Sequence, residues 1–373
     1  MNRSESIINK YIDNLILQSD PLAPKWNMEN ILYNKAPKWN YVDNCMITAL
    51  LMLYDLDNDP RLLDYSIKFT NAYVKKDGSI PTMNCADYNL DNINGAKNLM
   101  KLWKLTGEER YRFGFEKIWK EQLIRHPRLS CGSFWHKAIY PEQIWIDGVY
   151  MVLPFMAEYG KLYNTRGVIE DVKRQFFDVR KITRDPKTGL YYHGYDDTST
   201  MCWADKITGL SPEFWLRSNG WLCAALADVC EILPNADLCS NNLSELLHDI
   251  TKYCDDEGML LQLPIHKDMK GNYPETSGSL LYAYSALKAA RLGVCGDDIR
   301  QAGLRTFSTV TEKFIDNTKD VPVLRNICLV GGLGGENHRN GSAEYYLSEK
   351  VVENDAKGIA PYIMAYTEVK KII

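Results

Sequence analysis

Several features that mark common protein classes are missing from this sequence of 373 residues. It has no run of about 18 apolar residues, so no membrane-spanning helix is expected. Its N-terminus lacks the apolar segment of a secretory signal, and we therefore predict a cytoplasmic protein. The net charge is -4 and the basic clusters are as short as Lys75-Lys76. This pattern argues against nucleic acid as a partner, because such proteins carry a basic face or run.

The usual short motifs of metal and nucleophile chemistry are missing as well. The ten cysteines are scattered without a C-x-x-C pair, which predicts reduced and mostly buried thiols. The six histidines form no H-E-x-x-H motif, so no metal site is expected. No G-x-S-x-G motif supports a serine hydrolase. The glycine-rich segment 332–335 resembles a phosphate-binding loop only loosely, because its glycine spacing is wrong.

What the sequence does contain is a dominant helical period. Apolar residues recur at helical spacing, and Asp59-Pro60 is a favourable helix start. Consecutive helix pairs resemble each other at an offset of roughly 49 residues, as in repeated supersecondary units. The predicted helices cover residues 4–17, 40–56, 59–73, 91–106, 108–124, 144–162, 166–179, 214–233, 243–253, 277–290, 297–314 and 358–369.

Twelve helices in about six hairpins predict an all-α fold, an (α/α)6 barrel in which inner helices surround a cleft. An open solenoid is the alternative. The first and last helices are single, which favours a closed ring in which each is the partner of the other. No linker rich in Gly, Ser or Pro interrupts the chain, so residues 1–373 are predicted to form one domain.

Long loops rich in Gly, Asp, Tyr and Trp separate the helices at residues 129–143, 185–212 and 327–355. Loops of this length in a compact domain are usually functional or mobile. The chain also contains 9 Trp, 23 Tyr and 10 Phe, most of which are expected to fill the core. Aromatic rings beside polar residues also suit a sugar-binding cleft, because sugar rings have apolar faces.

Asp147 is the main candidate for chemistry, since it lies among apolar residues at the start of a predicted helix. One interpretation is an ordinary helix cap. The other is a carboxyl group whose pKa is raised by its apolar neighbours, so that it donates a proton near neutral pH. Asp91 begins the preceding unit, and a ring would bring both acids to one rim as an acid/base pair of sugar chemistry.

Other polar residues lie within aromatic segments. Arg217, between Trp215 and Trp221, is either a surface charge or the holder of a substrate carboxylate. His136 and His193 lie in aromatic loops and either line a site or form hydrogen bonds in the core.

Three ordered segments carry a family resemblance: 134–137 (Phe-Trp-His-Lys), 143–151 (Gln-Ile-Trp-Ile-Asp-Gly-Val-Tyr-Met) and 211–221 (Ser-Pro-Glu-Phe-Trp-Leu-Arg-Ser-Asn-Gly-Trp). Together they resemble the unsaturated rhamnogalacturonyl hydrolases of glycoside hydrolase family 105, which act in pectin degradation. The unsaturated glucuronyl hydrolases of family 88 are similar. The resemblance extends over residues 39–358 and also implies an (α/α)6 barrel.

The resemblance implies an unusual hydrolysis that needs no cofactor. The substrate would be an oligosaccharide left by a polysaccharide lyase, with a C4=C5 double bond in the uronic acid at its non-reducing end. In this family the catalytic acid, matched by Asp147, protonates C4 and helps water to add at C5. The resulting hemiketal opens and the glycosidic bond is lost. Asp91 matches a second acidic position that orients substrate or water.

The resemblance also implies a set of substrate-binding positions around the cleft. His193 and Arg217 match positions beside the unsaturated uronate. The remaining matches are Tyr41, His136, Lys137, Trp215 and Trp221.

Four alternatives stay open at this stage. One is an unsaturated glucuronyl hydrolase acting on ulvan or glycosaminoglycan fragments. The others are a glycan-binding toroid without catalysis, an epimerase, and a hydrolase of saturated glycosides on the same fold.

Overall fold

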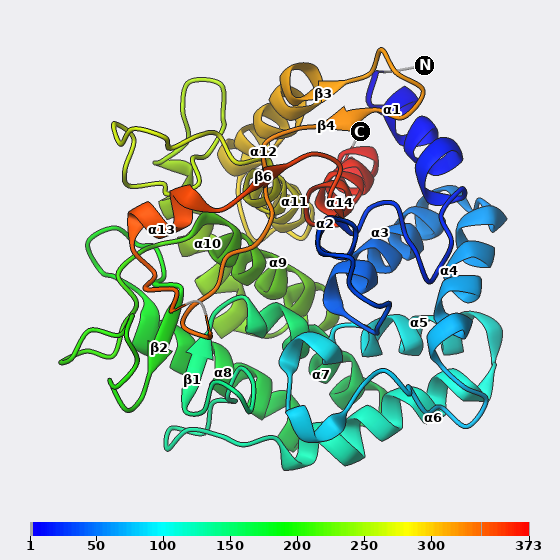
Figure 1. Cartoon of the computed structure of the whole chain (residues 1–373), viewed down its shortest axis with the longest axis horizontal. Helices are drawn as coiled ribbons and strands as arrows, with labels where there is room; N and C mark the ends of the chain where they lie inside the picture. The colour runs from blue at the N-terminus through cyan, green and yellow to red at the C-terminus, as the bar shows by residue number, and fades with distance from the viewer. Residues whose placement is uncertain (1–2, 337, 373) are drawn as a thin grey trace.

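The computed structural model describes residues 3–336 and 338–372, and its helices form two concentric rings (Figure 1). Within these residues six helices make the inner ring, and each packs against its neighbours. The last inner helix, α14 (Ala356–Ile372), packs against both α11 (Thr276–Arg291) and α3 (Tyr41–Asp57). This contact closes the ring, so the (α/α)6 barrel is confirmed and the open solenoid is excluded. The other inner helices are α5 (Ala96–Thr106), α7 (Gly148–Leu162) and α9 (Leu216–Ile232).

The inner and outer helices differ in their apolar pattern. Nearly every residue of α9 is buried, as expected for a helix surrounded by protein. Outer helix α8 (Arg166–Thr183) instead buries one stripe that includes Val172, Phe176 and Val179. The other outer helices are α1 (Arg3–Tyr11), α4 (Pro60–Tyr73), α6 (Glu109–Lys117), α10 (Asp237–Thr251) and α12 (Asp297–Thr309).

Local sequence signals set several helix starts. The carboxylate of Asp59 accepts a hydrogen bond from the Arg61 backbone N–H, and Pro60 occupies the first turn of α4, as predicted. The predicted start at residue 91 is wrong for an α-helix. Residues Leu90–Ile93 form a 3-10 turn capped by Asn89, and α5 begins only at Ala96.

The helix predicted from residue 144 also begins later than expected. Residues Gln143–Trp145 form strand β1, which pairs antiparallel with β2 (Gly194–Asp196), and α7 follows from Gly148. Alternating Ile and Trp suit a half-buried strand as well as a helix, and only the distant partner strand decides between the two. In this ladder Trp145 lies opposite Gly194.

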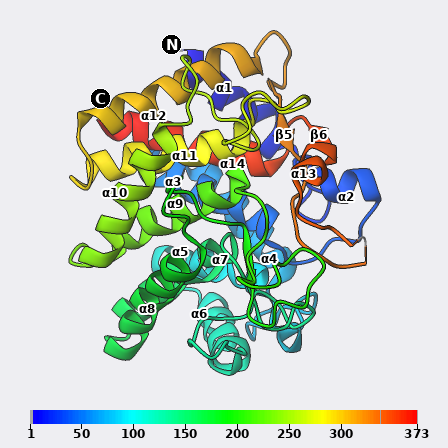
Figure 2. The ribbon, with the colours of Figure 1, turned by 90° about the vertical axis from the view of Figure 1, so that its left-hand side faces the viewer.

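Several short elements were not predicted. Helices α2 (Met28–Tyr33) and α13 (Ala343–Ser348) lie on the same side of the barrel as the pair β5 (Ile327–Cys328) and β6 (Val351–Val352) (Figure 2). A further pair joins β3 (Ile315–Asp316) to β4 (Val323–Leu324). These segments are too short for a sequence period to show, and α13 falls in the segment 327–355 that was predicted as a loop.

The sequence also predicted reduced cysteines and no membrane-spanning helix. All ten cysteines are free thiols, five of them buried. In the described part of the chain, no helix combines the length and the apolar character that a membrane span requires.

Candidate functional site

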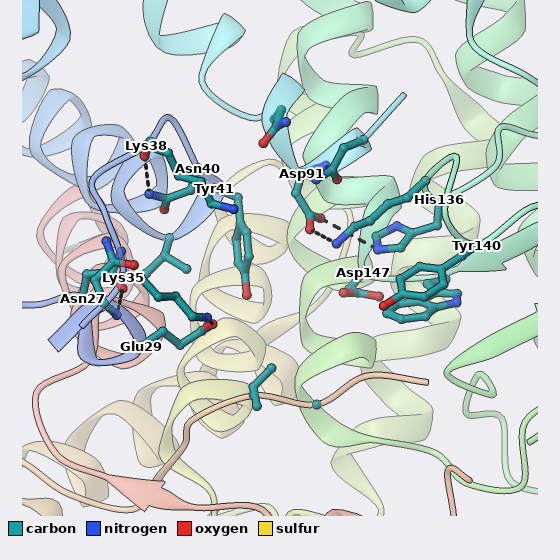
Figure 3. Close-up of a pocket in the computed structure, with 18 of the residues that line it drawn as sticks. Asn27, Glu29, Lys35, Lys38, Asn40, Tyr41, Asp91, His136, Tyr140 and Asp147 are labelled. Atoms are coloured by element: carbon teal, nitrogen blue, oxygen red, sulfur yellow. Dashed lines mark hydrogen bonds and ion pairs between the residues drawn. The ribbon is translucent and has the colours of Figure 1, made fainter. Parts of the chain in front are cut away.

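A pocket of about 250 Å³ lies beside α2, whose Glu29 and Asn30 line it. Its walls come from segments that are far apart in the sequence: 27–42, 89–92, 136–147 and 330–339. Five of the residues predicted to form the site line it together (Figure 3). They are Tyr41, Asp91, His136, Lys137 and Asp147.

Asp147 occupies the position just before α7, but its side chain makes no capping hydrogen bond. Its Oδ1 instead lies 3.3 Å from Nε2 of His193. The ladder between β1 and β2 explains this contact, since the Ile146 N–H donates to the His193 carbonyl at 3.0 Å. Asp147 therefore points into the pocket and is free for chemistry, because helix α7 does not use its carboxylate.

His193 is fully buried and is held from its other side. Its Nδ1 lies 2.6 Å from the hydroxyl of Tyr346, which belongs to α13. Because both ring nitrogens have partners, the orientation of the imidazole is fixed. The three side chains form a hydrogen-bonded row from Tyr346 through His193 to Asp147.

The pKa of Asp147 differs in direction from the prediction. Burial raises it, as expected, but the hydrogen bond from His193 and the electrostatic interaction with its imidazole outweigh burial and bring the pKa below its usual value. The apolar neighbours Ile144 and Ile146 are buried, but nothing in the sequence indicated that His193 would contact the carboxylate. Asp147 is therefore ionised at neutral pH.

Asp91 lines the same pocket as Asp147 (Figure 3) and is paired with a lysine. The Lys137 Nζ lies 2.6 Å from Asp91 Oδ2. Burial lowers the pKa of Lys137, but the negative charge of Asp91 outweighs this effect and the net pKa is raised. The pair forms because the Leu90 N–H donates to the His136 carbonyl at 3.1 Å, which joins the 3-10 turn to the loop.

His136 is a neutral part of the wall. Burial and the charge of Lys137 bring its pKa well below the usual value. Its ring stacks on Trp145 at 4.5 Å, and Tyr140 stacks on Trp145 at 4.8 Å. The helix start at Gly148 makes room for this stack, because a Cβ there would lie 2.6 Å from His136 Nδ1. A flat aromatic wall next to two carboxylates suits a sugar ring.

The opposite wall comes from the start of α3 and from α2. Tyr41 is the first residue of α3 and faces Asp91 and Asp147 across the gap (Figure 3). Burial raises its pKa well above the usual value, so the phenol stays protonated and can donate a hydrogen bond. Glu29 of α2 is held by Lys357 at 3.1 Å and by Lys35 at 3.2 Å.

Four of the predicted residues are not among those that line this pocket. His193 lies behind Asp147, as described above. Arg217 is buried rather than on the surface, and it donates to the carbonyls of Cys328 and Leu329. Its guanidinium also lies 4.6 Å from the ring of Trp215, while Trp221 stacks on Tyr150 in the core. These residues support the site from behind.

The structure adds residues that the sequence interpretation missed. Tyr346 lies in a segment predicted as a loop, so nothing connected it to His193. Tyr140 and Glu29 had no motif around them. Arg339 follows the glycine-rich segment, which was considered only as a phosphate loop.

No group of three or more His, Cys, Asp or Glu side chains suited to a metal ion occurs within residues 3–336 and 338–372. The pocket and the residues directly behind it supply carboxylates, imidazoles, lysines and phenols. Such groups transfer protons and orient water.

Comparison with known proteins identifies the family. The model of Glycosyl Hydrolase Family 88 matches residues 19–373. A solved family 105 glycoside hydrolase of C. acetobutylicum ATCC 824 has 34% identity and a TM-score of 0.89, with 99% of each chain covered.

Two curated relatives match part of the chain. Protein Atu3128 of Agrobacterium fabrum is 40% identical over 229 residues, which are 58% of this chain and 97% of that protein. The unsaturated rhamnogalacturonyl hydrolase YesR of Bacillus subtilis is 26% identical over 213 residues, which are 54% of this chain and 59% of YesR.

Proposed function

The chain belongs to the glycoside hydrolases of families 88 and 105, and we propose that it removes the unsaturated uronic acid from the non-reducing end of lyase-generated oligosaccharides. The glycosidic bond to this uronic acid is lost through hydration of its C4=C5 vinyl ether. The observation that carries the proposal is the carboxylate of Asp147, which is held by His193 and faces a pocket with an aromatic wall.

In the proposed reaction Asp147 donates a proton to C4. Positive charge then develops at C5 next to the ring oxygen, and water adds there. The Asp147 carboxylate formed in the first step accepts a proton from that water, so one residue is acid and then base. The hemiketal at C5 opens to a ketone and leaves a hemiacetal at C1, and collapse of that hemiacetal to an aldehyde breaks the glycosidic bond and releases the leaving sugar.

Asp147 must first gain a proton, although His193 favours its ionised form. A uronate bound in the pocket adds a second negative charge and excludes water, and both effects raise the pKa of Asp147. The 3.3 Å contact with His193 Nε2 allows a proton to pass between the two groups. Binding of an anionic substrate thus favours the protonated form of Asp147, the form that can donate a proton to the double bond.

Asp91 and Lys137 have a different proposed role. Their ion pair of 2.6 Å holds a fixed carboxylate next to Asp147, with one oxygen directed at the lysine. We assign Asp91 to hydrogen bonds with substrate hydroxyls or with the attacking water. Tyr41 and the stacked rings of Trp145 and Tyr140 would hold the sugar between the two walls.

The leaving sugar is proposed to be rhamnose, from rhamnogalacturonan fragments of pectin. The similarity to YesR supports this substrate. We also propose that the enzyme acts in the cytoplasm, because ten free thiols suit a reducing compartment.

A labelling experiment tests the reaction. Turnover of an unsaturated rhamnogalacturonan disaccharide in heavy-oxygen water should remove the ultraviolet absorbance of the vinyl ether and place the label at C5. A label at C1 would instead show ordinary glycosidic attack. Unsaturated glucuronyl oligosaccharides, assayed in parallel, decide the substrate class. Persistence of the absorbance with both substrates would contradict the proposed function.

A further inference from the structure

The glycine-rich segment 331–335 forms part of the pocket wall. Gly331 lines the pocket and packs against the ring of Trp215, where a Cβ would lie 2.6 Å from the nearest ring atom. Leu333 is fully buried in a cluster with Trp145 and Trp203. The glycines therefore allow the chain to lie close to the aromatic residues behind the site, which explains the run without any phosphate ligand.

This segment positions Arg339 at the pocket. The backbones of Gly334 and Arg339 are hydrogen-bonded, with the Gly334 N–H donating to the Arg339 carbonyl at 2.8 Å. The Arg339 Nε donates to the Gly334 carbonyl at 3.0 Å, and Nη2 donates to the Tyr140 hydroxyl at 3.2 Å. Nη2 also donates to the Leu333 carbonyl at 3.4 Å. Nη1 lies against Gly332 and has no hydrogen-bond acceptor among the described residues, so it can donate to a ligand in the pocket that Arg339 lines.

The positive charge of Arg339 is not neutralised by a neighbour. No carboxylate lies within 4.0 Å of its guanidinium in the described part of the chain. Glu349 is within electrostatic range, but it forms its hydrogen bond with Tyr345. Carbonyl and hydroxyl acceptors orient a guanidinium without removing its charge. Arg339 is thus a partly buried cation that is oriented in advance.

The other cations near the pocket are less suited to an anionic ligand. Lys35 is paired with Glu29, and Lys137 is paired with Asp91. Lys38 is exposed on a long flexible side chain. Arg217, which the sequence offered as the carboxylate holder, is directed to backbone carbonyls in the interior and does not line the pocket.

We propose that Arg339 binds the carboxylate of the unsaturated uronate, an assignment that rests on the proposed function. A planar guanidinium is well matched to a carboxylate. Tyr140, which receives the hydrogen bond of Arg339, stacks on Trp145, two residues before Asp147. Arg339 and Asp147 therefore line one pocket, and the stack of Tyr140 on Trp145 connects the segments that carry them.

The test measures binding without turnover, in the Asp147→Asn background. Calorimetry gives the Kd of the unsaturated uronyl disaccharide and of its uronate methyl ester, which keeps the sugar and the double bond but lacks the charge. With Arg339 present the acid should bind about 10- to 100-fold more tightly than the ester. In Arg339→Gln this ratio should fall to about 1. Arg325→Gln, which removes an exposed arginine elsewhere, should leave the ratio unchanged.

An unchanged acid-to-ester ratio in Arg339→Gln would overturn the proposal, even if both ligands bind more weakly. Equal weakening would indicate only a structural role for the loop. If Arg339→Gln does not fold, as judged by circular dichroism, Tyr140→Phe provides the second measurement. It keeps the ring stack and removes only the hydroxyl that orients Arg339, so the ratio should fall a few-fold, and an unchanged ratio would count against the proposal.

The proposed function is tested separately by wild-type turnover. Wild-type turnover with an unchanged ratio in Arg339→Gln means that the reaction is correct and the assignment of Arg339 is wrong. Absence of turnover, with the ratio still dependent on Arg339, means that the pocket binds uronates but does not hydrate them.

Discussion

His193 Nε2 lies 3.3 Å from Asp147 Oδ1, although the two residues are 46 positions apart in the sequence. The register of β1 and β2 creates the contact, because Trp145 lies opposite Gly194 and the next residues meet at the end of the ladder. Tyr346 then holds the other ring nitrogen of the imidazole, Nδ1. The proposed acid is thus positioned by strand pairing and by α13, and the helix that follows it does not hold its side chain.

Replacing Asp147 with Asn should remove the proton donor while keeping the shape of the pocket. We expect kcat to fall about 10²- to 10⁴-fold, as is typical for loss of a general acid. Substrate binding, measured by calorimetry, should remain. Asp64→Asn, an exposed substitution on α4, is the control and should keep the wild-type rate. A near-normal rate in Asp147→Asn would refute the mechanism.

Tyr346→Phe should loosen His193 without removing an aromatic ring. The lost hydrogen bond of 2.6 Å is expected to lower kcat about tenfold, with KM nearly unchanged. The pH profile of kcat should shift as well, because the hydrogen bond of His193 lowers the pKa of Asp147 and Tyr346 holds that imidazole in place. Tyr362→Phe removes a buried hydroxyl in the core and should change stability without moving that profile. An unchanged pH profile of kcat in Tyr346→Phe would show that Tyr346 has only a structural role.

Stability should depend on pH through Glu29. Burial raises its pKa, but the charges of Lys357 and Lys35 outweigh burial and lower it from 4.5 to about 2. A lowered pKa contributes stability that is complete above pH 4.5 and is lost as the pH falls through about 2. Glu29→Gln should therefore destabilise the protein by about 2–3 kcal/mol at pH 7.

Urea unfolding at pH 7 and at pH 3 measures this effect of Glu29. The difference between wild type and Glu29→Gln should be smaller at pH 3. Glu353→Gln, which removes an exposed partner 3.6 Å from Arg325, should cost at most about 1 kcal/mol at either pH. An equal difference for Glu29→Gln at both pH values would contradict the assigned ion pairs.

Two glycine substitutions distinguish an effect on the site from an effect on the scaffold. Gly148→Ala places a Cβ 2.6 Å from His136 Nδ1, so the imidazole must move. We expect a loss of about 1–3 kcal/mol in stability and at least a tenfold loss of activity. Gly167 lies in α8, where an added Cβ would meet no atom within 4 Å, so Gly167→Ala should stabilise by about 0.5–1 kcal/mol and keep full activity. Full activity in Gly148→Ala would show that the position of His136 is unimportant.

The sequence by itself determined the scaffold. Apolar residues at helical spacing, together with signals such as Asp59-Pro60, gave the helices of both rings, because these are local properties of the chain. The family resemblance also identified Asp91, Asp147 and Lys137, which the fold brings into one pocket. The direction of the Asp147 pKa was wrong, since burial could be inferred from apolar neighbours but the histidine that opposes it could not.

Only the tertiary structure decided how the site is held. The contact of His193 with Asp147 depends on strand register, and the burial of Arg217 and the exposure of Arg339 to the pocket depend on where distant loops lie. Hydrogen bonds and charge interactions are set by distances in space, and residues 46 or more positions apart have no fixed distance until the ring closes. Sequence spacing therefore fixes the helices, and the fold fixes which charges meet.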